Sequence, residues 1–391
     1  LGQHRSGCYP SCMARVLVLG GGFGGIAAAT ALRARLNPDD EVVLVDRADD
    51  FAMGLRKTWA ILGISPIAYG TRSLAGLSHR GIRVIRGTVD SIDAARRSVV
   101  IDGDRFEADA LVIALGAAQA TDAIPGLDEH GHNAWDRYHV EQTHGFVDDF
   151  RGGRVVIGIF GVPYPCPPAP YELALLLADR LDARGIEAEV TVFGPAPITL
   201  PILGAAGCAM LDERLDERGC RYLGSRVATA VTARDVRFAD GDTLAFDLLL
   251  AVPPYRCPSV LVEAGLAPAG GWVQVDRSTL ETAHAEVYAI GDATGIGLAN
   301  GMSLPKAGIF AEKEGEVVAA RIAARLRGET PTVTYTGEGA CFLEMGAGEA
   351  SLISGEFFGD PPAASLSPPS VNQRADKERF EMERLERWFG G

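Results

Sequence analysis

The sequence lacks any apolar run long enough to cross a bilayer. No stretch of its 391 residues reaches the roughly 18 consecutive apolar residues that a spanning helix needs. The first twelve residues, LGQHRSGCYPSC, also lack the apolar core of a secretory signal. We therefore interpret residues 1–12 as a leader, without fixed structure or foreign to the protein, ahead of a native start at Met13. The sequence predicts a cytoplasmic protein that contacts a membrane at most peripherally.

Cysteine is sparse, and basic residues are outnumbered by acidic ones. The seven cysteines stand at scattered spacings that match neither a metal-binding repeat nor the disulfide framework of a small secreted protein, so we predict no metal site. The formal charge of −14 argues against nucleic acid as a partner. No solenoid-length repeat occurs, and nothing in the sequence indicates an oligomeric state.

Short apolar runs alternate with helical patterns, which favours an α/β fold with parallel sheets. RVLVL and EVVLVD flank one helical pattern near the start of the chain, and RVVIGIF begins a second such unit at Arg154. After Gly270 and Gly271 the chain is expected to return to its first domain. We predict two Rossmann-like dinucleotide-binding domains and a small C-terminal α+β region, with boundaries at 13–120 plus 271–328, 121–270 and 329–391.

A dinucleotide site is predicted at the first strand–helix junction. The stretch LGGGFGG places Gly20, Gly22 and Gly25 at G-x-G-x-x-G spacing, and Asp46 follows at the end of the next strand. Glycines let the backbone approach a pyrophosphate, the helix N-terminus favours its charge, and the carboxylate accepts hydrogen bonds from ribose hydroxyls. A merely tight turn would not need all of these features in register.

Two further segments carry a resemblance that identifies the dinucleotide. DALVIALGA (109–117) and VYAIGDAT (287–294) resemble the additional flavin motifs of the pyridine nucleotide-disulfide oxidoreductase superfamily, whose fold is glutathione-reductase-like. The resemblance implies FAD as the cofactor. It also implies that FAD is held by Ala114 and Gly116 in the first motif, and by Gly291 and Asp292 in the second.

The second domain lacks the features of a nicotinamide nucleotide site. After its first strand, Gly158 and Gly161 are followed by prolines, which have no N–H groups to offer a phosphate. The next strand ends at Phe193 without a carboxylate for an adenosine ribose. We therefore expect that this domain does not bind NAD(P)H.

A cysteine surrounded by prolines stands at that junction instead. The motif PYPCPPAPYE around Cys166 closely resembles that of the flavoprotein subunit of flavocytochrome c sulfide dehydrogenase and of the sulfide:quinone oxidoreductases. The resemblance implies that Cys166 lies beside the flavin and pairs with a C-terminal cysteine, for which Cys341 is the candidate. Taken alone, Cys341 reads as an inert buried thiol. The helix that follows Cys166 is expected to favour its thiolate.

The same resemblance suggests roles for two charged residues. Glu172 is the candidate general base, although an acid in a first helical turn also has a purely structural explanation. Lys306 is expected near the flavin pyrimidine ring, where a positive charge stabilises the reduced flavin; the bland alternative is a solvated lysine. The segment 51–63 contains no cysteine, so FAD is expected to be non-covalent. The remaining cysteines in the folded part, Cys208, Cys220 and Cys257, are interpreted as structural.

The resulting functional hypothesis is an FAD-dependent oxidoreductase. It is expected to oxidise sulfide or a related small sulfur compound through a Cys166 and Cys341 redox pair, and to pass electrons to a quinone or a cytochrome-type acceptor. Two alternatives stay open: a type II NADH:quinone-reductase-like flavoprotein, and a non-catalytic flavin-binding redox sensor.

Overall fold

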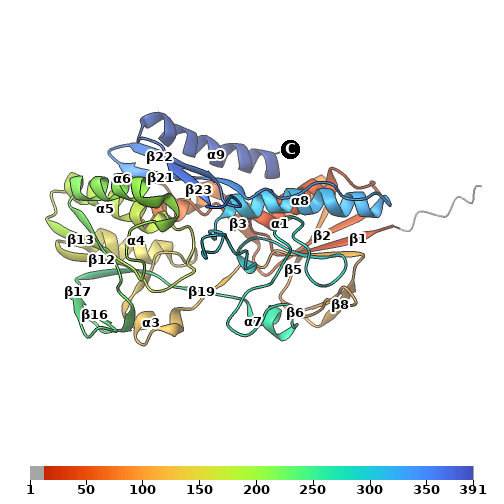
Figure 1. Cartoon of the computed structure of the whole chain (residues 1–391), viewed down its shortest axis with the longest axis horizontal. Coiled ribbons are helices and arrows are strands. Elements are labelled where there is room, and N and C mark those ends of the chain that lie inside the picture. Colours follow the sequence, from red (N-terminus) through yellow and green to blue (C-terminus); the bar gives the residue numbers. More distant parts are fainter. Residues whose placement is uncertain (1–12, 391) are drawn as a thin grey trace, which may run out of the picture.

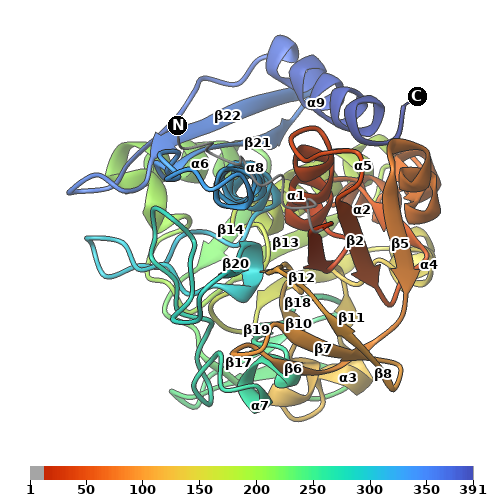
Figure 2. The same ribbon diagram turned by 90° about the vertical axis from the view of Figure 1, so that its right-hand side faces the viewer.

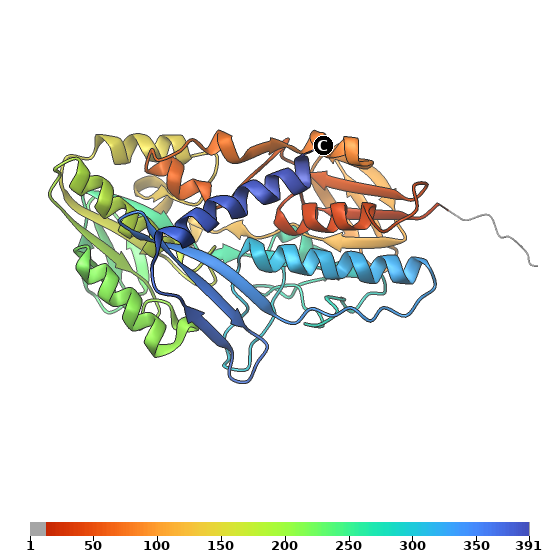
Figure 3. The same cartoon turned by 90° about the horizontal axis from the view of Figure 1, so that it is seen from above.

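A computed structural model describes residues 13–390, and the expected leader, residues 1–12, lies outside the described residues (Figure 1). Two parallel sheets occupy opposite ends of the molecule, and a C-terminal layer lies over both (Figures 1 and 3). The predicted fold class, two Rossmann-like α/β units with a small α+β region, is confirmed. No helix within residues 13–390 combines the length and the apolarity that crossing a bilayer requires.

The first sheet is wholly parallel, and its strands are buried on both faces, as helix-covered sheets require. In spatial order its strands are β20 (Val287–Ala289), β9 (Ala110–Ile113), β1 (Arg15–Leu19), β2 (Glu41–Asp46) and β5 (Ile82–Arg86). One face packs against α1 (Phe23–Arg33) and α8 (Gly308–Leu326). The other packs against α7 (Ser259–Glu263) and an antiparallel sheet of β6 (Val89–Asp93), β7 (Ser98–Ile101) and β8 (Asp104–Glu107).

Helices α1 and α8 lie side by side (Figure 2) because small residues face each other between them. A Cβ atom added to Gly315 would stand 2.5 Å from the carbonyl oxygen of Gly24, so a larger residue there would force the helices apart. This close packing brings the N-terminal ends of two helices to the same edge of the sheet, where strands β1, β9 and β20 also end.

The second sheet repeats this parallel design. Its strands, in spatial order, are β11 (His132–Asn133), β18 (Leu248–Val252), β12 (Gly153–Ile159), β13 (Ala188–Phe193) and β14 (Cys220–Leu223). One face packs against α4 (Val140–Asp149), α5 (Ala169–Ala183) and α6 (Gly204–Glu217). The opposite face packs against α3 (Leu127–His130) and an antiparallel sheet of β15 (Ala228–Val231), β16 (Asp235–Phe238) and β17 (Thr243–Ala245).

Helix α5 begins at Ala169 and includes Pro170 and Glu172 in its first turn. A proline is tolerated in a first helical turn because its missing N–H has no partner inside the helix there. Cys166 therefore stands three residues before the helix.

The chain crosses between the two sheets twice, and the crossings pair as the antiparallel strands β10 (Ala118–Gln119) and β19 (Tyr255–Arg256). The C-terminal layer consists of β21 (Glu338–Gly346), β22 (Glu349–Glu356), β23 (Ala363–Leu366) and α9 (Val371–Phe389). A short unit of β3 (Asp50–Ala52), α2 (Arg56–Ile61) and β4 (Thr71–Ser73) follows β2. These crossings and layers place residues from all parts of the chain around one cavity.

Candidate active site

The glycine motif forms a tight loop whose middle glycine faces open space. Gly20 has a φ of +111°, and a Cβ there would stand 2.2 Å from the Ala114 carbonyl oxygen. A Cβ on Gly25 would stand 1.8 Å from the Gly20 carbonyl oxygen, so only glycine fits where the helix packs against the loop. Gly22, in contrast, has no atom within 4 Å of an added Cβ and lines a large cavity. This is the arrangement expected where a pyrophosphate approaches the backbone.

Asp46 lies at the end of β2 and supports the same loop. Its Oδ2 accepts a hydrogen bond from the Gly21 N–H at 2.6 Å, and its Oδ1 accepts one from the Ala48 N–H at 2.7 Å. These bonds fix the carboxylate beside the glycine loop. Each oxygen keeps a further lone pair with which it can accept a ribose hydroxyl.

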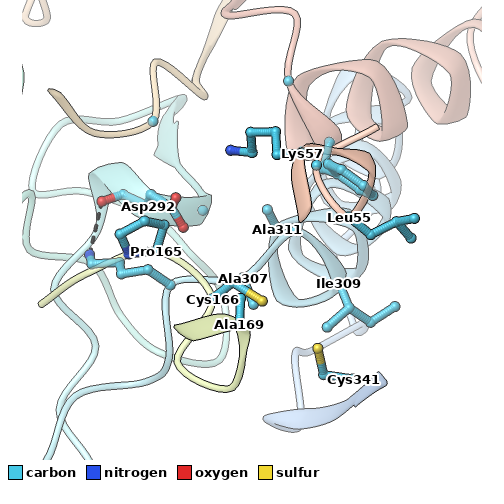
Figure 4. A pocket seen from close by; sticks show the side chains of 18 of the residues that line it. Leu55, Lys57, Pro165, Cys166, Ala169, Asp292, Ala307, Ile309, Ala311 and Cys341 are labelled. Atoms are coloured by element: carbon cyan, nitrogen blue, oxygen red, sulfur yellow. Dashed lines mark hydrogen bonds between the residues drawn. The ribbon is translucent and has the colours of Figure 1, made fainter. Parts of the chain in front are cut away.

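The large cavity has a volume of about 320 Å³ and extends from the glycine loop to the two cysteines (Figure 4). All four residues that the flavin motifs predicted line it: Ala114, Gly116, Gly291 and Asp292. Burial raises the pKa of the Asp292 carboxyl, which the nearby ammonium groups of Lys306 and Lys57 oppose. The cavity therefore joins one dinucleotide loop to one thiol pair.

Lys306 is buried, not solvated. Its Nζ donates hydrogen bonds to the carbonyl oxygens of Asp292 at 2.8 Å and Thr294 at 2.5 Å, and it lies 3.7 Å from the centroid of the Trp272 ring. Burial lowers its pKa to about 8. The lysine thus orients the turn that carries Asp292 and adds positive charge to the cavity wall.

The prolines around Cys166 hold it in an unusual backbone conformation. Cys166 has a φ of +46°, its N–H donates to the Lys306 carbonyl oxygen at 2.9 Å, and its own carbonyl accepts from the Ala169 N–H at 2.8 Å. The carbonyl of Pro163 accepts from the Tyr255 N–H at 2.7 Å. The loop is therefore anchored to the chain crossing and to the start of α8, which fixes the sulfur in place.

Cys341 comes from β21 and meets Cys166 at one end of the cavity (Figure 4). The structure holds both as free thiols that line the same cavity. The interaction between the two thiols, together with burial, raises the pKa of Cys166 well above its usual range, and the same interaction lowers the pKa of Cys341. The interaction between the thiols thus makes Cys341 the more acidic of the two, opposite to the helix effect expected at Cys166.

Glu172 lies close to the thiol pair and is 4% exposed. Its Oε2 is 2.7 Å from Lys377 Nζ and accepts the Glu344 N–H at 3.0 Å. Burial raises the pKa of its carboxyl, and the Lys377 charge opposes that shift. Glu172 is therefore a buried acid in an ion cluster, and the structure brings it together with both predicted redox cysteines.

Sequence reasoning missed the other members of that cluster. Lys377 also bonds to Glu344 at 2.8 Å, and Glu344 pairs with Arg374 at 2.6 Å. Both cations belong to α9, whose buried positions Lys377, Glu381, Leu385 and Trp388 recur at helical spacing. Only Leu385 and Trp388 of these are apolar, so the sequence signals this buried face only in part.

Lys57 is a second missed residue. It extends from α2 into the cavity on the side opposite Asp292 (Figure 4), and its Nζ donates to the Trp135 carbonyl oxygen at 3.2 Å. Burial lowers the pKa of its ammonium group. Lys57 and Lys306 thus place two cations around the cavity.

Aromatic rings occupy the carboxyl end of the second parallel sheet. Phe160 and Phe193 pack edge to face with ring centroids 5.2 Å apart, and Phe193 is fully buried. A Cβ on Gly158 would stand 2.6 Å from the Phe160 ring and 2.7 Å from the Phe193 ring. Packed rings and prolines therefore lie where a dinucleotide domain offers glycine N–H groups and a carboxylate.

Comparison with known proteins gives consistent matches over most of the chain. The pattern of the family described as pyridine nucleotide-disulphide oxidoreductase matches residues 14–315. The mitochondrial sulfide:quinone oxidoreductase of Mus musculus is 24% identical over 366 residues, covering 88% of this chain and 79% of that protein. The sulfide-quinone reductase of Aquifex aeolicus is 27% identical over 382 residues, covering 88% of this chain and 83% of that protein.

Among solved structures, that of the sulfide:quinone oxidoreductase from Aquifex aeolicus superposes with a TM-score of 0.88 at 24% sequence identity. The match covers 96% of this chain and 91% of that chain. At this identity the superposition shows a common fold.

Proposed function

Because the chain belongs to the pyridine nucleotide-disulphide oxidoreductase family, we propose that it is a flavoprotein oxidoreductase that oxidises sulfide or a related small sulfur compound through Cys166 and Cys341. One observation carries this proposal. Two cysteines that stand far apart in the sequence, Cys166 and Cys341, meet in the cavity that the flavin-motif residues line. Neither a nicotinamide-dependent reductase nor a simple binding module needs that pair.

The residues of the first domain fit FAD. Gly22 leaves room for a pyrophosphate, Asp46 has free lone pairs for a ribose, and Gly116, Gly291 and Asp292 line the adjoining cavity. When bound, FAD supplies a two-electron acceptor that returns electrons singly or in pairs. We infer that it is held without a covalent bond, because the segment 51–63 that faces the cavity contains no cysteine.

Thiol–disulfide chemistry gives the cysteine pair its role. In the oxidised protein Cys166 and Cys341 form a disulfide, and the sulfur of the substrate attacks one of the two. A new S–S bond to the substrate sulfur forms as the Cys–Cys bond breaks, and the other cysteine leaves as a thiolate. The rigid loop around Cys166 serves this step, since attack geometry is lost when a sulfur moves by about an ångström.

Glu172 and Lys377 handle charge beside the reacting sulfurs. The electrostatic field of Glu172 raises the pKa of both thiols, whereas the Lys377 charge lowers it, so the two groups oppose each other at the pair. A buried carboxyl beside a thiol pair can exchange a proton with a neighbouring sulfur. We assign Glu172 as the proton-exchanging group and Lys377 as the cation that balances it.

We propose a quinone as the electron acceptor. Phe342 and Phe380 line the large cavity with ring centroids 5.9 Å apart, and they offer an apolar, aromatic contact to a planar molecule. The relatives named above act on quinones by name. Since quinones dissolve in bilayers, we further propose that the protein meets its acceptor at a membrane surface as a peripheral protein.

Anaerobic mixing tests this function and separates the alternatives. Sulfide is expected to bleach the oxidised flavin, and NADH is expected to leave it oxidised because Phe193 and the prolines occupy the second nucleotide position. Cys166→Ser should abolish the reaction with sulfide while dithionite still reduces the flavin. Bleaching by NADH at a catalytic rate would support the type II NADH:quinone reductase, and bleaching by neither compound would support a redox sensor. Sulfide bleaching that survives Cys166→Ser rules out the cysteine relay.

A further inference from the structure

A second, small cavity adjoins Cys341. Its volume is about 30 Å³, and it shares Cys341 with the large cavity. We call it the Cys341 pocket; its walls include Pro167, Pro168, Pro305, Phe310, Ile353 and Phe357. Its lining within the described residues contains no charged side chain and, apart from the thiol, no side chain that donates a hydrogen bond.

The walls of the Cys341 pocket are rigid. Ile353 pairs directly with Cys341 across the β21–β22 ladder, so the two side chains stand on the same face of the sheet. Phe310 and Phe357 pack edge to face with ring centroids 5.0 Å apart. Two prolines of the loop around Cys166 complete one side. A cavity with such walls stays open instead of collapsing around the sulfur.

The volume limits what the pocket can hold. A water molecule needs about 10–15 Å³ of such space and two to four polar partners, so this pocket has room for about two non-hydrogen atoms but few partners for water. A small, weakly hydrogen-bonding molecule fits these conditions, and hydrogen sulfide has a single non-hydrogen atom.

The lining also selects the charge of the occupant. An ion loses its hydration in an apolar site and gains nothing in return when no partner is present. The charged groups that act on Cys341, namely Glu172, Lys377 and the Cys166 thiol, line the large cavity and not the Cys341 pocket. The neutral molecule is therefore favoured over the hydrosulfide anion.

We propose that the Cys341 pocket binds the substrate as neutral H₂S against Cys341 and excludes larger or charged sulfur compounds. The proposal rests on the proposed function and adds the substrate species and its site. Neutral H₂S and the disulfide give one hydropersulfide and one thiol: an S–S bond forms, the Cys–Cys bond breaks, and the cysteine that leaves as a thiolate takes up the proton that H₂S releases. Atoms and charge balance without another reactant.

Substitution of Ile353 tests the site in the flavin-loaded protein. Ile353→Phe fills the pocket, and Ile198→Phe is the matched control outside it. We expect Ile353→Phe to raise the sulfide concentration for half-maximal flavin reduction about tenfold or more, with the limiting rate kept. Ile198→Phe, the same substitution at a 43% exposed position that lines neither cavity, should behave as the wild type. Flavin content and reduction by dithionite report folding, and Leu200→Phe, which fills the same pocket, replaces Ile353→Phe if that variant does not fold.

The pH dependence tests the charge. Starting from the disulfide form removes the titration of both thiols from the measurement. As pH rises through the ionisation of H₂S, the total sulfide concentration that gives half-maximal flavin reduction should rise. The corresponding concentration of neutral H₂S should stay constant. A half-saturating total concentration that stays level or falls would show that the anion binds and would overturn the proposal.

The two proposals fail in different ways. Wild-type flavin that sulfide does not reduce contradicts the proposed function itself. Wild-type flavin that sulfide reduces, together with Ile353→Phe and Leu200→Phe variants whose half-saturation equals that of Ile198→Phe, contradicts the Cys341 pocket alone.

Discussion

At the scale of single residues, one buried carboxyl with a raised pKa holds the turn of the second flavin motif. Glu314 is 1% exposed, and its Oε2 accepts the Gly291 N–H at 2.6 Å. Burial raises its pKa to about 7, with the charge of Asp292 adding to the shift and that of Lys306 opposing it. Glu314 thus supports, from inside α8, the turn that lines the cavity.

We expect Glu314 to make the folded protein less stable as pH rises. Its folded pKa of about 7 lies above its ordinary value of 4.5, so between those values the folded state holds a proton that the unfolded state has lost. The contribution is full below pH 4.5, falls as pH rises, and has lost about 3 kcal/mol above pH 7. Glu314→Gln keeps an acceptor for Gly291 but removes the titration.

Urea unfolding at pH 5 and pH 7.5 checks this. The fall in the free energy of unfolding between these pH values should be smaller in Glu314→Gln than in the wild type by most of that amount. An equal fall in both proteins would show that Glu314 does not titrate in this range.

Some residues could be placed from the sequence because local geometry demands them. Gly20, Gly22 and Asp46 are recognisable since a pyrophosphate loop between a strand and a helix permits few alternatives. The meeting of Cys166 with Cys341 came from resemblance, because nothing local in β21 distinguishes a redox thiol from a packed one. The pKa values of both thiols also depend on Glu172 and Lys377, which reach the pair from other parts of the chain.

At the scale of elements, α9 contributes to the reaction site and not merely to the surface. It begins at Val371, where the Ser370 side chain accepts a hydrogen bond from the Gln373 N–H, and it brings Lys377 between two buried carboxylates. Arg384 of the same helix pairs with Glu312 of α8 at 2.7 Å. Ion pairs therefore join α9 to both the thiol region and the flavin domain.

Removing the Lys377 charge should be costly. Lys377→Met leaves Glu172 buried beside Glu344 without its cation, and the loss of one partner of a buried ion pair costs about 3–5 kcal/mol. Chemical denaturation measures the change. Adding Glu172→Gln to this variant should recover part of the loss, since it removes one of the stranded charges.

Arg379→Met is the matched control on the same helix. The Arg379 side chain is 59% exposed and pairs with Asp376 on the surface, so its loss should change the free energy of unfolding by about 0.5 kcal/mol or less. Similar small losses in Lys377→Met and Arg379→Met would show that Lys377 does not stabilise the cluster.

The sequence predicts the existence of α9 but not its orientation. Its many charges are typical of a solvated helix, and a lysine or glutamate at a buried position cannot be told from an exposed one without its partners. Glu172 and Glu344, which neutralise Lys377, lie 205 and 33 residues away. Pairing over such distances is a property of the tertiary fold.

At the scale of the whole molecule, the two parallel-sheet domains differ at the turn that follows β1 in one and β12 in the other. The glycine loop at Gly22 is open, whereas the corresponding turn at Gly158 meets Phe160 and Phe193. The doubled architecture was predictable from alternating strands and helices. The prolines of the second domain argue against a phosphate-binding loop, and they predict a rigid loop around Cys166 instead.

The flavin should leave the chain on unfolding. Of the segment 51–63, Gly54, Leu55, Lys57 and Thr58 line the cavity, and the segment has no cysteine to tether the isoalloxazine ring. After denaturation in urea and passage through a membrane that retains the chain, the flavin absorbance is expected in the filtrate. The folded protein, filtered without urea, serves as the control and should retain it. Flavin that stays with the denatured chain would contradict non-covalent binding.

The thiol pair has a mechanical consequence. Cys166 belongs to the second domain and Cys341 to the C-terminal layer, 175 residues farther along. A disulfide between the two cysteines would close the chain from 166 to 341 into a covalent loop, which includes the segment that returns to the first domain. Reduction of the disulfide would open this loop. In the proposed cycle, oxidation of the thiol pair therefore restricts the conformational freedom of the chain between the cysteines, and reduction restores it.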